Sequence, residues 1–295
     1  MGIFLQGNAL LGLLAAGIWG MGDFSGGMGV KRAGGSTGAA LRVVLMSHTA
    51  SFSVLLAISL IRGDRFPHGA VLAWGLAAGV AGGLSLTAFY IALSRGAMGA
   101  AAAISGLLAA AIPAAVDMLS EGTPGWRRTA GFVIAGVAIW LVAGGSSEPN
   151  STPQPSGTML LAILAGAGFG CYFVALKFAG AGGLIWPMAT ARIGSITTCS
   201  LLLLASLFSR NPPPPARITP VVVRWALSTA LLDTTGNLLF IAATRAGRLD
   251  VAAVLASLYP ASTILLAALL LKEKPTHLQA IGMVTAVVAV VMIAL

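Results

Sequence analysis

AVLAWGLAAGVAGGLSLTAFYIALS, residues 70–94, is an apolar stretch without a single charged side chain. A helix needs about 20 such residues to cross the hydrocarbon core of a bilayer, so this stretch is long enough. Gly75, Gly79 and Gly83 recur at every fourth position and therefore share one face of a helix. Small residues in such a row let transmembrane helices approach closely. The stretch predicts a tightly packed membrane-spanning helix.

Nine further apolar stretches accompany this one, and together they predict an all-α integral membrane protein with ten transmembrane helices. We expect these spans at residues 8–30, 38–61, 70–94, 98–118, 127–144, 157–179, 186–208, 219–244, 249–271 and 276–294. Composition agrees, because 57% of the residues are hydrophobic and only 8% are charged, whereas soluble domains carry roughly 25% charged residues. The net charge of +9 comes from basic residues scattered at segment ends, which argues against a nucleic-acid partner.

The second half of the chain repeats the first at a spacing of about 150 residues. The matching pairs are Gly20 with Gly170, Arg42 with Arg192, Arg95 with Arg245, Ser105 with Ser257, and Glu121 with Glu273. Each copy holds five spans, an odd number, so the two copies must enter the bilayer from opposite sides. We expect two inverted five-helix repeats, residues 1–145 and 157–295, joined by a polar linker at 146–156.

The segment LYPASTILLAALLLKEKP, residues 258–275, has a proline, an apolar run and a glutamate that leads into the last span. This pattern, with the ten spans, resembles the EamA-type branch of the drug/metabolite transporter superfamily. The first copy keeps Glu121 and Pro124 but has Leu108 where the second has Pro260, and its proline comes later, at Pro113. Within the branch, the chain resembles exporters of amino acids, including aromatic amino acids.

The resemblance implies a basket of helices around a central cavity in a bacterial inner membrane, with both termini cytoplasmic. It places spans one, three, four, six, eight and nine around the cavity and spans five and ten outside it. The basic residues are divided almost evenly between the two faces, so the positive-inside rule does not fix the orientation.

Three acidic residues lie inside predicted spans, where a charge is costly and usually functional: Asp23, Asp117 and Asp233. Asp23 follows Trp19 by four residues, so one helix face offers an aromatic wall and a carboxylate for a ligand's side chain and ammonium. The alternative is that Asp23 reaches the membrane interface. Asp117 lies near a span end and can reach interfacial water. Asp233 is one helical turn from Asn237, and the pair either faces the cavity or bonds a neighbour such as Ser257 or Thr87.

His48 and the three tyrosines are the remaining polar groups of interest. His48 is either a core residue whose hydrogen bonds are satisfied or a proton acceptor. Arg42 and Arg192 lie at the beginning of their spans, where they either reach lipid headgroups or bind anionic groups at the cavity mouth. Tyrosine combines apolar area with one polar group. We expect substrate to contact Trp19, Asp23, Tyr90, Tyr172, Asp233, Asn237, Ser257 and Tyr259, and we expect proton sites among Asp23, His48 and Asp233.

These patterns predict a secondary transporter that exports small metabolites, most plausibly amino acids, by alternating access. The sequence contains no phosphate-binding loop, no metal-ligand spacing and no nucleophile motif, so we expect neither an enzyme nor a cofactor or metal. The expected partners are the substrate and the lipid bilayer, with the chain as a monomer or weak dimer. The alternatives are a channel or facilitator for other metabolites or drugs, and a membrane scaffold without transport.

Overall fold

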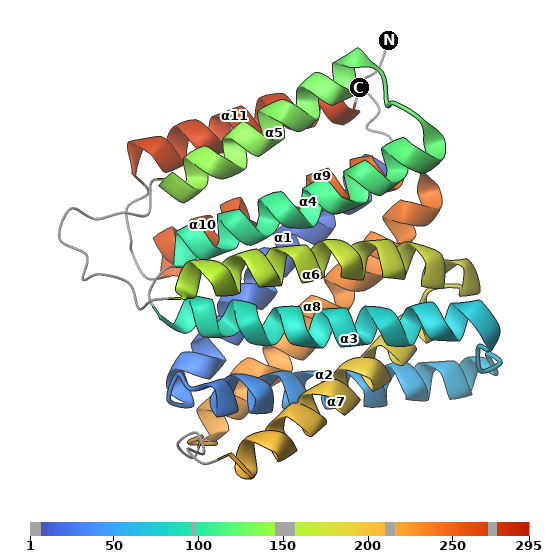
Figure 1. Cartoon of the computed structure of the whole chain (residues 1–295), viewed down its shortest axis with the longest axis vertical. Helices are drawn as coiled ribbons and strands as arrows, with labels where there is room; N and C mark the ends of the chain where they lie inside the picture. Colours follow the sequence, from blue (N-terminus) through green and yellow to red (C-terminus); the bar gives the residue numbers. More distant parts are fainter. Residues whose placement is uncertain (1–6, 96–97, 145–156, 210–215, 271–275, 295) are drawn as a thin grey trace.

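The computed structural model describes residues 7–95, 98–144, 157–209, 216–270 and 276–294, and within these ranges the regular structure is entirely helical (Figure 1). The helices are α1 (Gly7–Arg32), α2 (Thr37–Arg62), α3 (Gly69–Ser94), α4 (Met98–Glu121), α5 (Trp126–Gly144), α6 (Thr158–Ala179), the short 3-10 helix η1 (Gly180–Gly182), α7 (Ile185–Leu207), α8 (Pro220–Ala246), α9 (Leu249–Ala256), α10 (Tyr259–Leu270) and α11 (His277–Ala294). Seven of them, α1 to α4 and α6 to α8, are long and apolar enough to cross a membrane.

The helix ends follow local sequence signals. Ser36 precedes α2 and its side chain accepts a hydrogen bond from the Ala39 amide at 3.1 Å, while Gly63 ends the helix with φ +67°. A left-handed residue at this position is the usual stop for a helix, and glycine adopts it without strain. Thr219 caps α8 in the same way, just before Pro220 in the first turn.

The helices stack in layers along the longest axis of the molecule (Figure 1). The pair α5 and α11 lies at one end, α2 and α7 lie at the other, and α1, α3, α6 and α8 fill the middle. α1 and α8 are antiparallel neighbours. Gly247, after α8, lies against Asn8 at the beginning of α1, and the Arg217 amide before α8 bonds the Ala33 carbonyl after α1 at 3.0 Å.

The glycine row of α3 packs against α7, as its spacing predicts. A methyl group at Gly75 would meet Thr190, one at Gly79 would meet the Ala191 backbone, and one at Gly83 would meet the side chain of Ser195. The two helices therefore pack backbone against backbone beside the middle of the bundle.

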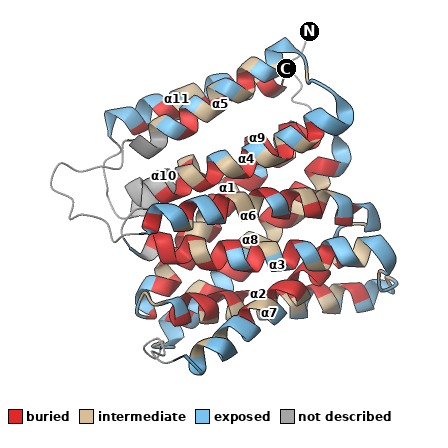
Figure 2. Cartoon of the chain, viewed as in Figure 1, coloured by how far each residue is buried: buried red, intermediate tan, exposed pale blue. Residues whose placement is uncertain are grey.

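Large apolar side chains cover the outside of the bundle, where Figure 2 shows exposed residues along the outer faces of α2, α5, α7 and α11. Examples are Leu60, Trp140, Leu201 and Val284, all more than 60% exposed. In water such a surface would be a liability. With the seven long apolar helices, it identifies an integral membrane protein whose outer surface faces lipid.

The ninth predicted span, residues 249–271, is not one continuous helix. It breaks after Ala256 and restarts at Tyr259 as α10. Pro260 explains the break, because proline has no amide hydrogen to donate to the carbonyl four residues earlier. In the first half, Leu108 holds the matching position, and α4 runs through it without interruption.

Candidate functional site

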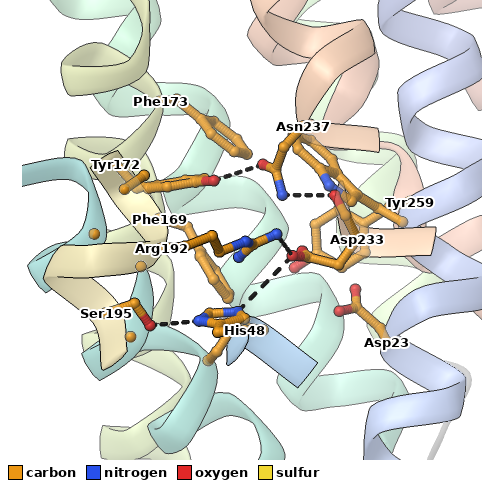
Figure 3. A pocket seen from close by; sticks show the side chains of 16 residues that line it. Asp23, His48, Phe169, Tyr172, Phe173, Arg192, Ser195, Asp233, Asn237 and Tyr259 are labelled. Atoms are coloured by element: carbon orange, nitrogen blue, oxygen red, sulfur yellow. Dashed lines mark hydrogen bonds and ion pairs between the residues drawn. The ribbon is translucent and has the colours of Figure 1, made fainter. Parts of the chain in front are cut away.

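A central cavity of about 40 Å³ lies between helices of both halves of the chain (Figure 3). Its lining residues come from the middle of their helices, as His48 in α2 and Asp233 in α8 illustrate. The other lining residues are Trp19 and Asp23 of α1, Gly79, Gly82, Gly83 and Leu86 of α3, Phe169, Tyr172 and Phe173 of α6, Ala191, Arg192 and Ser195 of α7, Asn237 of α8, and Tyr259 of α10. The cavity therefore lies near the middle of the helical bundle.

The set of helices around the cavity differs in part from the expected one. Spans one, three, six, eight and nine contribute, and none of the lining residues comes from α5 or α11. However, no described α4 side chain lines the cavity, whereas α2 and α7 do. The close packing of α3 on α7 explains the difference, because it brings the middle of α7 to the cavity wall.

A buried ion pair between Arg192 and Asp233 is the central polar contact of the cavity. The Arg192 guanidinium also donates to Ser51 Oγ at 2.9 Å and to Thr234 Oγ1 at 3.2 Å. The hydroxyls of Ser51 and Thr234 bond each other at 2.5 Å. One arginine of α7 thus holds α2 and α8 together in the middle of the bundle.

Arg192 was expected at a headgroup or at the cavity mouth, and both interpretations are wrong. Its residue is only 2% exposed. The signal that identifies it is its depth, because Arg192 lies about two turns inside the predicted span 186–208, where a cation needs a counter-ion. Its repeat partner Arg42 stays near the beginning of α2 and bonds the Gly38 carbonyl at 3.1 Å.

His48 belongs to this network. Its Nδ1 lies 2.5 Å from Ser195 Oγ, and its Nε2 lies 3.9 Å from Asp233 Oδ2. The imidazole is 2% exposed and forms part of the cavity wall. Although the resemblance left the second span outside the cavity, the structure places His48 beside the ion pair, as Figure 3 shows.

Asn237 joins α8 to α6 at the same wall. The Tyr172 hydroxyl donates to Asn237 Oδ1 at 2.7 Å, and Asn237 Nδ2 donates to the Asp233 carbonyl at 2.7 Å. The side chain therefore lines the cavity and makes an interhelical bond as well, but its partner is Tyr172 rather than Ser257 or Thr87.

Aromatic rings form the apolar part of the wall. Trp19 stacks on Phe173 with ring centroids 5.1 Å apart and nearly parallel planes, and Phe240 packs against both rings. A methyl group at Gly236 would come within 2.6 Å of the Trp19 indole, so this glycine makes room for the ring. Trp19, as predicted, shares its helix face with Asp23 toward the cavity.

Asp23 points into the cavity from α1 and has no hydrogen bond or ion pair with any described residue (Figure 3). The prediction that Asp23 reaches the membrane interface is therefore wrong. Tyr259 also lines the cavity, and its hydroxyl bonds Ser105 Oγ at 2.6 Å.

Two residues of the predicted site lie behind the wall. Tyr90 is 1% exposed and its ring packs against Gly26, while Ser257 is fully buried at the break between α9 and α10. Neither lines the cavity, and neither hydroxyl has a hydrogen-bond partner among the described residues.

A second charged cluster connects α4 to α6 and to the beginning of α9. Lys177 Nζ lies 2.8 Å from Asp117 and 3.1 Å from Glu121, and Arg248 lies 3.6 Å from Asp117 and 2.8 Å from Asp250. Asp117 also accepts a bond from the Asp250 amide at 3.1 Å. Its side chain is fully buried, so the expected contact with interfacial water is absent. Hydrogen bonds to Asp250 raise the pKa of the Arg248 guanidinium, which therefore stays charged.

Comparison with protein families decides the identity. The EamA-like transporter family matches residues 147–295, half of the chain. The chain belongs to the EamA-like transporter family. Membership confirms the resemblance of residues 258–275 to the drug/metabolite transporter superfamily and makes the chain a membrane transporter rather than an enzyme.

A solved structure shares the fold of nearly the whole chain. One solved crystal structure of a protein is similar to this EamA-like transporter over 97% of its length and over 95% of the other chain, with a TM-score of 0.66 and 18% sequence identity. This similarity concerns the fold alone. No curated protein matches the sequence.

Proposed function

We propose that the chain is a secondary transporter that exports small metabolites, foremost amino acids, across a bacterial inner membrane by alternating access. One observation carries this proposal: a mid-membrane cavity, built by helices of both halves, combines a buried ion pair with an aromatic wall and an unpaired carboxylate. Secondary transporters bind their substrates in such a place, between repeats and near the bilayer midplane.

The packing of the helices supports two inverted repeats, residues 1–145 and 157–295. α1 packs on α8, and its counterpart α6 packs on α3, the counterpart of α8. Likewise α2 packs on its counterpart α7, and α5 on its counterpart α11. This exchange of partners is the pattern that a two-fold axis between the halves produces, and five spans in each half would put that axis in the membrane plane. Movement of one half against the other would open the cavity first to one face and then to the other.

The chemistry of the wall supports a substrate with an amino group and an apolar part. In this proposal Asp23 binds the ammonium, the Trp19 and Phe173 rings contact the side chain, and the Tyr172–Asn237 pair and Tyr259 orient the solute. Asp23, His48 and Asp233 are the proposed sites for a coupling proton, since all three lie at the cavity. Tyr90 and Ser257 would act by supporting the wall.

Uptake into proteoliposomes tests the proposal. We expect saturable uptake of labelled amino acids, counter-exchange with unlabelled substrate, and loss of uptake when Asp23 is replaced by Asn. Asp64→Asn is the matched control, because Asp64 pairs with Arg62 at 2.9 Å outside the central cavity. Flux that rises linearly with concentration and shows no counter-exchange would identify a channel. Absence of flux for every solute tested would indicate a membrane scaffold without transport.

A pH gradient tests the coupling sites in the same vesicles. If protons drive transport, an imposed gradient stimulates uptake by the native chain, and joint replacement by Asp23→Asn, His48→Gln and Asp233→Asn removes the stimulation. Stimulation that persists in the triple variant would exclude all three residues as proton carriers.

A further inference from the structure

The charges of the central cavity do not balance. With both carboxyl groups ionised and His48 neutral, the two carboxylates of Asp23 and Asp233 and the one guanidinium of Arg192 give the described residues of the wall a net charge of −1. An unperturbed histidine is mostly neutral at pH 7. An excess charge inside a membrane protein is costly, and a bound ion of opposite sign is one way to compensate it.

The guanidinium of Arg192 is already engaged. It pairs with Asp233, and it also donates to Ser51 Oγ and Thr234 Oγ1. Arg192 is 2% exposed. A carboxylate of a solute would therefore have to displace Asp233 from Arg192, which would leave a second buried carboxylate without a counter-ion. Among the described residues that line it, the cavity thus has no free cationic group for an anion.

Asp23 is the group that remains open. It is the one charged side chain of the cavity that forms no ion pair with a described residue, and it points into the cavity opposite His48 and the ion pair (Figure 3). A carboxylate in this position offers a charge-assisted hydrogen bond to an ammonium group, the stronger type of hydrogen bond.

The aromatic residues of the cavity wall also favour a positively charged solute. Five aromatic rings face the cavity, those of Trp19, Phe169, Tyr172, Phe173 and Tyr259. The faces of aromatic rings attract cations, most strongly where the pair is desolvated. The same rings offer apolar area to the body of a solute.

We infer that the cavity selects organic monocations, solutes with one ammonium group, an aromatic or apolar body and no free carboxylate, and that Asp23 is the residue that determines this selectivity. This inference rests on the proposed transport function. Within the proposed class of small metabolites with an amino group, it places amines and amino-acid derivatives with a masked carboxyl group as the preferred substrates and free amino acids as weaker ones. A zwitterion would leave the wall with its excess negative charge.

Three solutes that share a phenyl ring and differ in charge test the inference. Phenethylamine is a cation, phenylalanine a zwitterion and 3-phenylpropionate an anion. Binding to the purified protein by calorimetry, and saturable uptake corrected for protein-free liposomes, are measured for each. We expect phenethylamine to bind about tenfold more tightly than phenylalanine, a difference of about 1.4 kcal/mol, and phenylpropionate to bind most weakly.

Variants assign the selectivity to Asp23. Asp23→Asn should bring the affinities for phenethylamine and phenylalanine together, Asp23→Glu should retain the preference, and Asp64→Asn should behave as the native chain does. The three-solute series on the native chain needs no variant, so it remains decisive if Asp23→Asn does not fold.

Each outcome has one meaning. Equal or tighter binding and faster saturable uptake of phenylalanine would overturn the inference and leave amino-acid transport intact. An unchanged preference in Asp23→Asn would overturn the role of Asp23. Absence of saturable uptake for all three solutes and for the wider amino-acid panel would overturn the proposed function itself.

Discussion

At the scale of single residues, the most consequential contact is the ion pair between Arg192 and Asp233. Replacing a buried pair by apolar groups is often tolerated, but removing one partner leaves an uncompensated charge and costs about 3–5 kcal/mol. The two hydroxyls that bond Arg192, those of Ser51 and Thr234, would also lose their charged partner. The pair is therefore expected to behave as a unit.

Arg192→Gln should thus lower the stability of the protein by about 3–5 kcal/mol, visible as a lower thermal midpoint in detergent. Adding Asp233→Asn should recover part of the loss, because the unpaired carboxylate is then removed. Strictly additive effects of the two substitutions would show that the residues do not interact. Arg42→Gln is the control, since Arg42 bonds only the first turn of its own helix among the described residues.

Most of the residues that line the cavity wall with polar or aromatic groups could be predicted from the sequence. Trp19, Asp23, Tyr172, Asp233, Asn237 and Tyr259 could be chosen from the sequence because polar and aromatic groups stand out within apolar spans, and all six line the cavity. The sequence pattern predicts Arg192 at a headgroup or at the cavity mouth, which is wrong. It gives no reason to choose Ser195 as a site residue. Their contacts join α7 to α2 and α8, and the spacing of residues along one chain does not reveal which helices cross at mid-membrane.

At the scale of helices, the contact of α3 with α7 depends on glycine. An added methyl at Gly79 would meet the Ser195 amide at 2.7 Å and the Ala191 backbone closer still, so neither a rotamer change nor a small shift of one side chain relieves the clash. The same contact positions Ser195 and Arg192 at the cavity.

Gly79→Ala should destabilise the protein by about 1–3 kcal/mol, the usual cost of overpacking, and should weaken substrate binding by displacing α7. Gly17→Ala is the matched control on α1, where an added methyl has open space, and alanine is favoured over glycine in a helix by about 1 kcal/mol. Thermal unfolding of both variants in the same detergent measures the difference. Equal midpoints would contradict the packing argument.

Helix boundaries were largely predictable, because apolar length and end signals such as Ser36 and Pro220 are local. The apolar length predicts one continuous ninth span. It does not predict the break, although Pro260 belongs to the segment that resembles the family. A proline within an apolar run permits either a kink or a full interruption, and tertiary packing selects between them. In α4, Pro113 is accommodated inside the helix.

At the scale of the whole molecule, the inverted arrangement can be tested at the entry points of the two halves. Gly7, at the beginning of α1, and Gly157, just before α6, occupy matching places in the repeat, and both are exposed. In a background with Cys171→Ser and Cys199→Ala, a cysteine in place of either glycine should react with a membrane-impermeant maleimide from opposite faces. Reaction of both from one face would refute the inverted arrangement.

The charged cluster around Asp117 makes the two membrane faces unequal. By the spacing of the repeat, Glu121 keeps a charged counterpart in Glu273, whereas Asp117, Lys177, Arg248 and Asp250 correspond to Leu269, Gly27 and uncharged positions within 96–100. Two identical halves would give the transporter two conformations related by a two-fold rotation and equal in free energy. Ion pairs that have no counterpart in the other repeat remove this equality of free energy. The resting protein should therefore populate one of the two conformations more than the other.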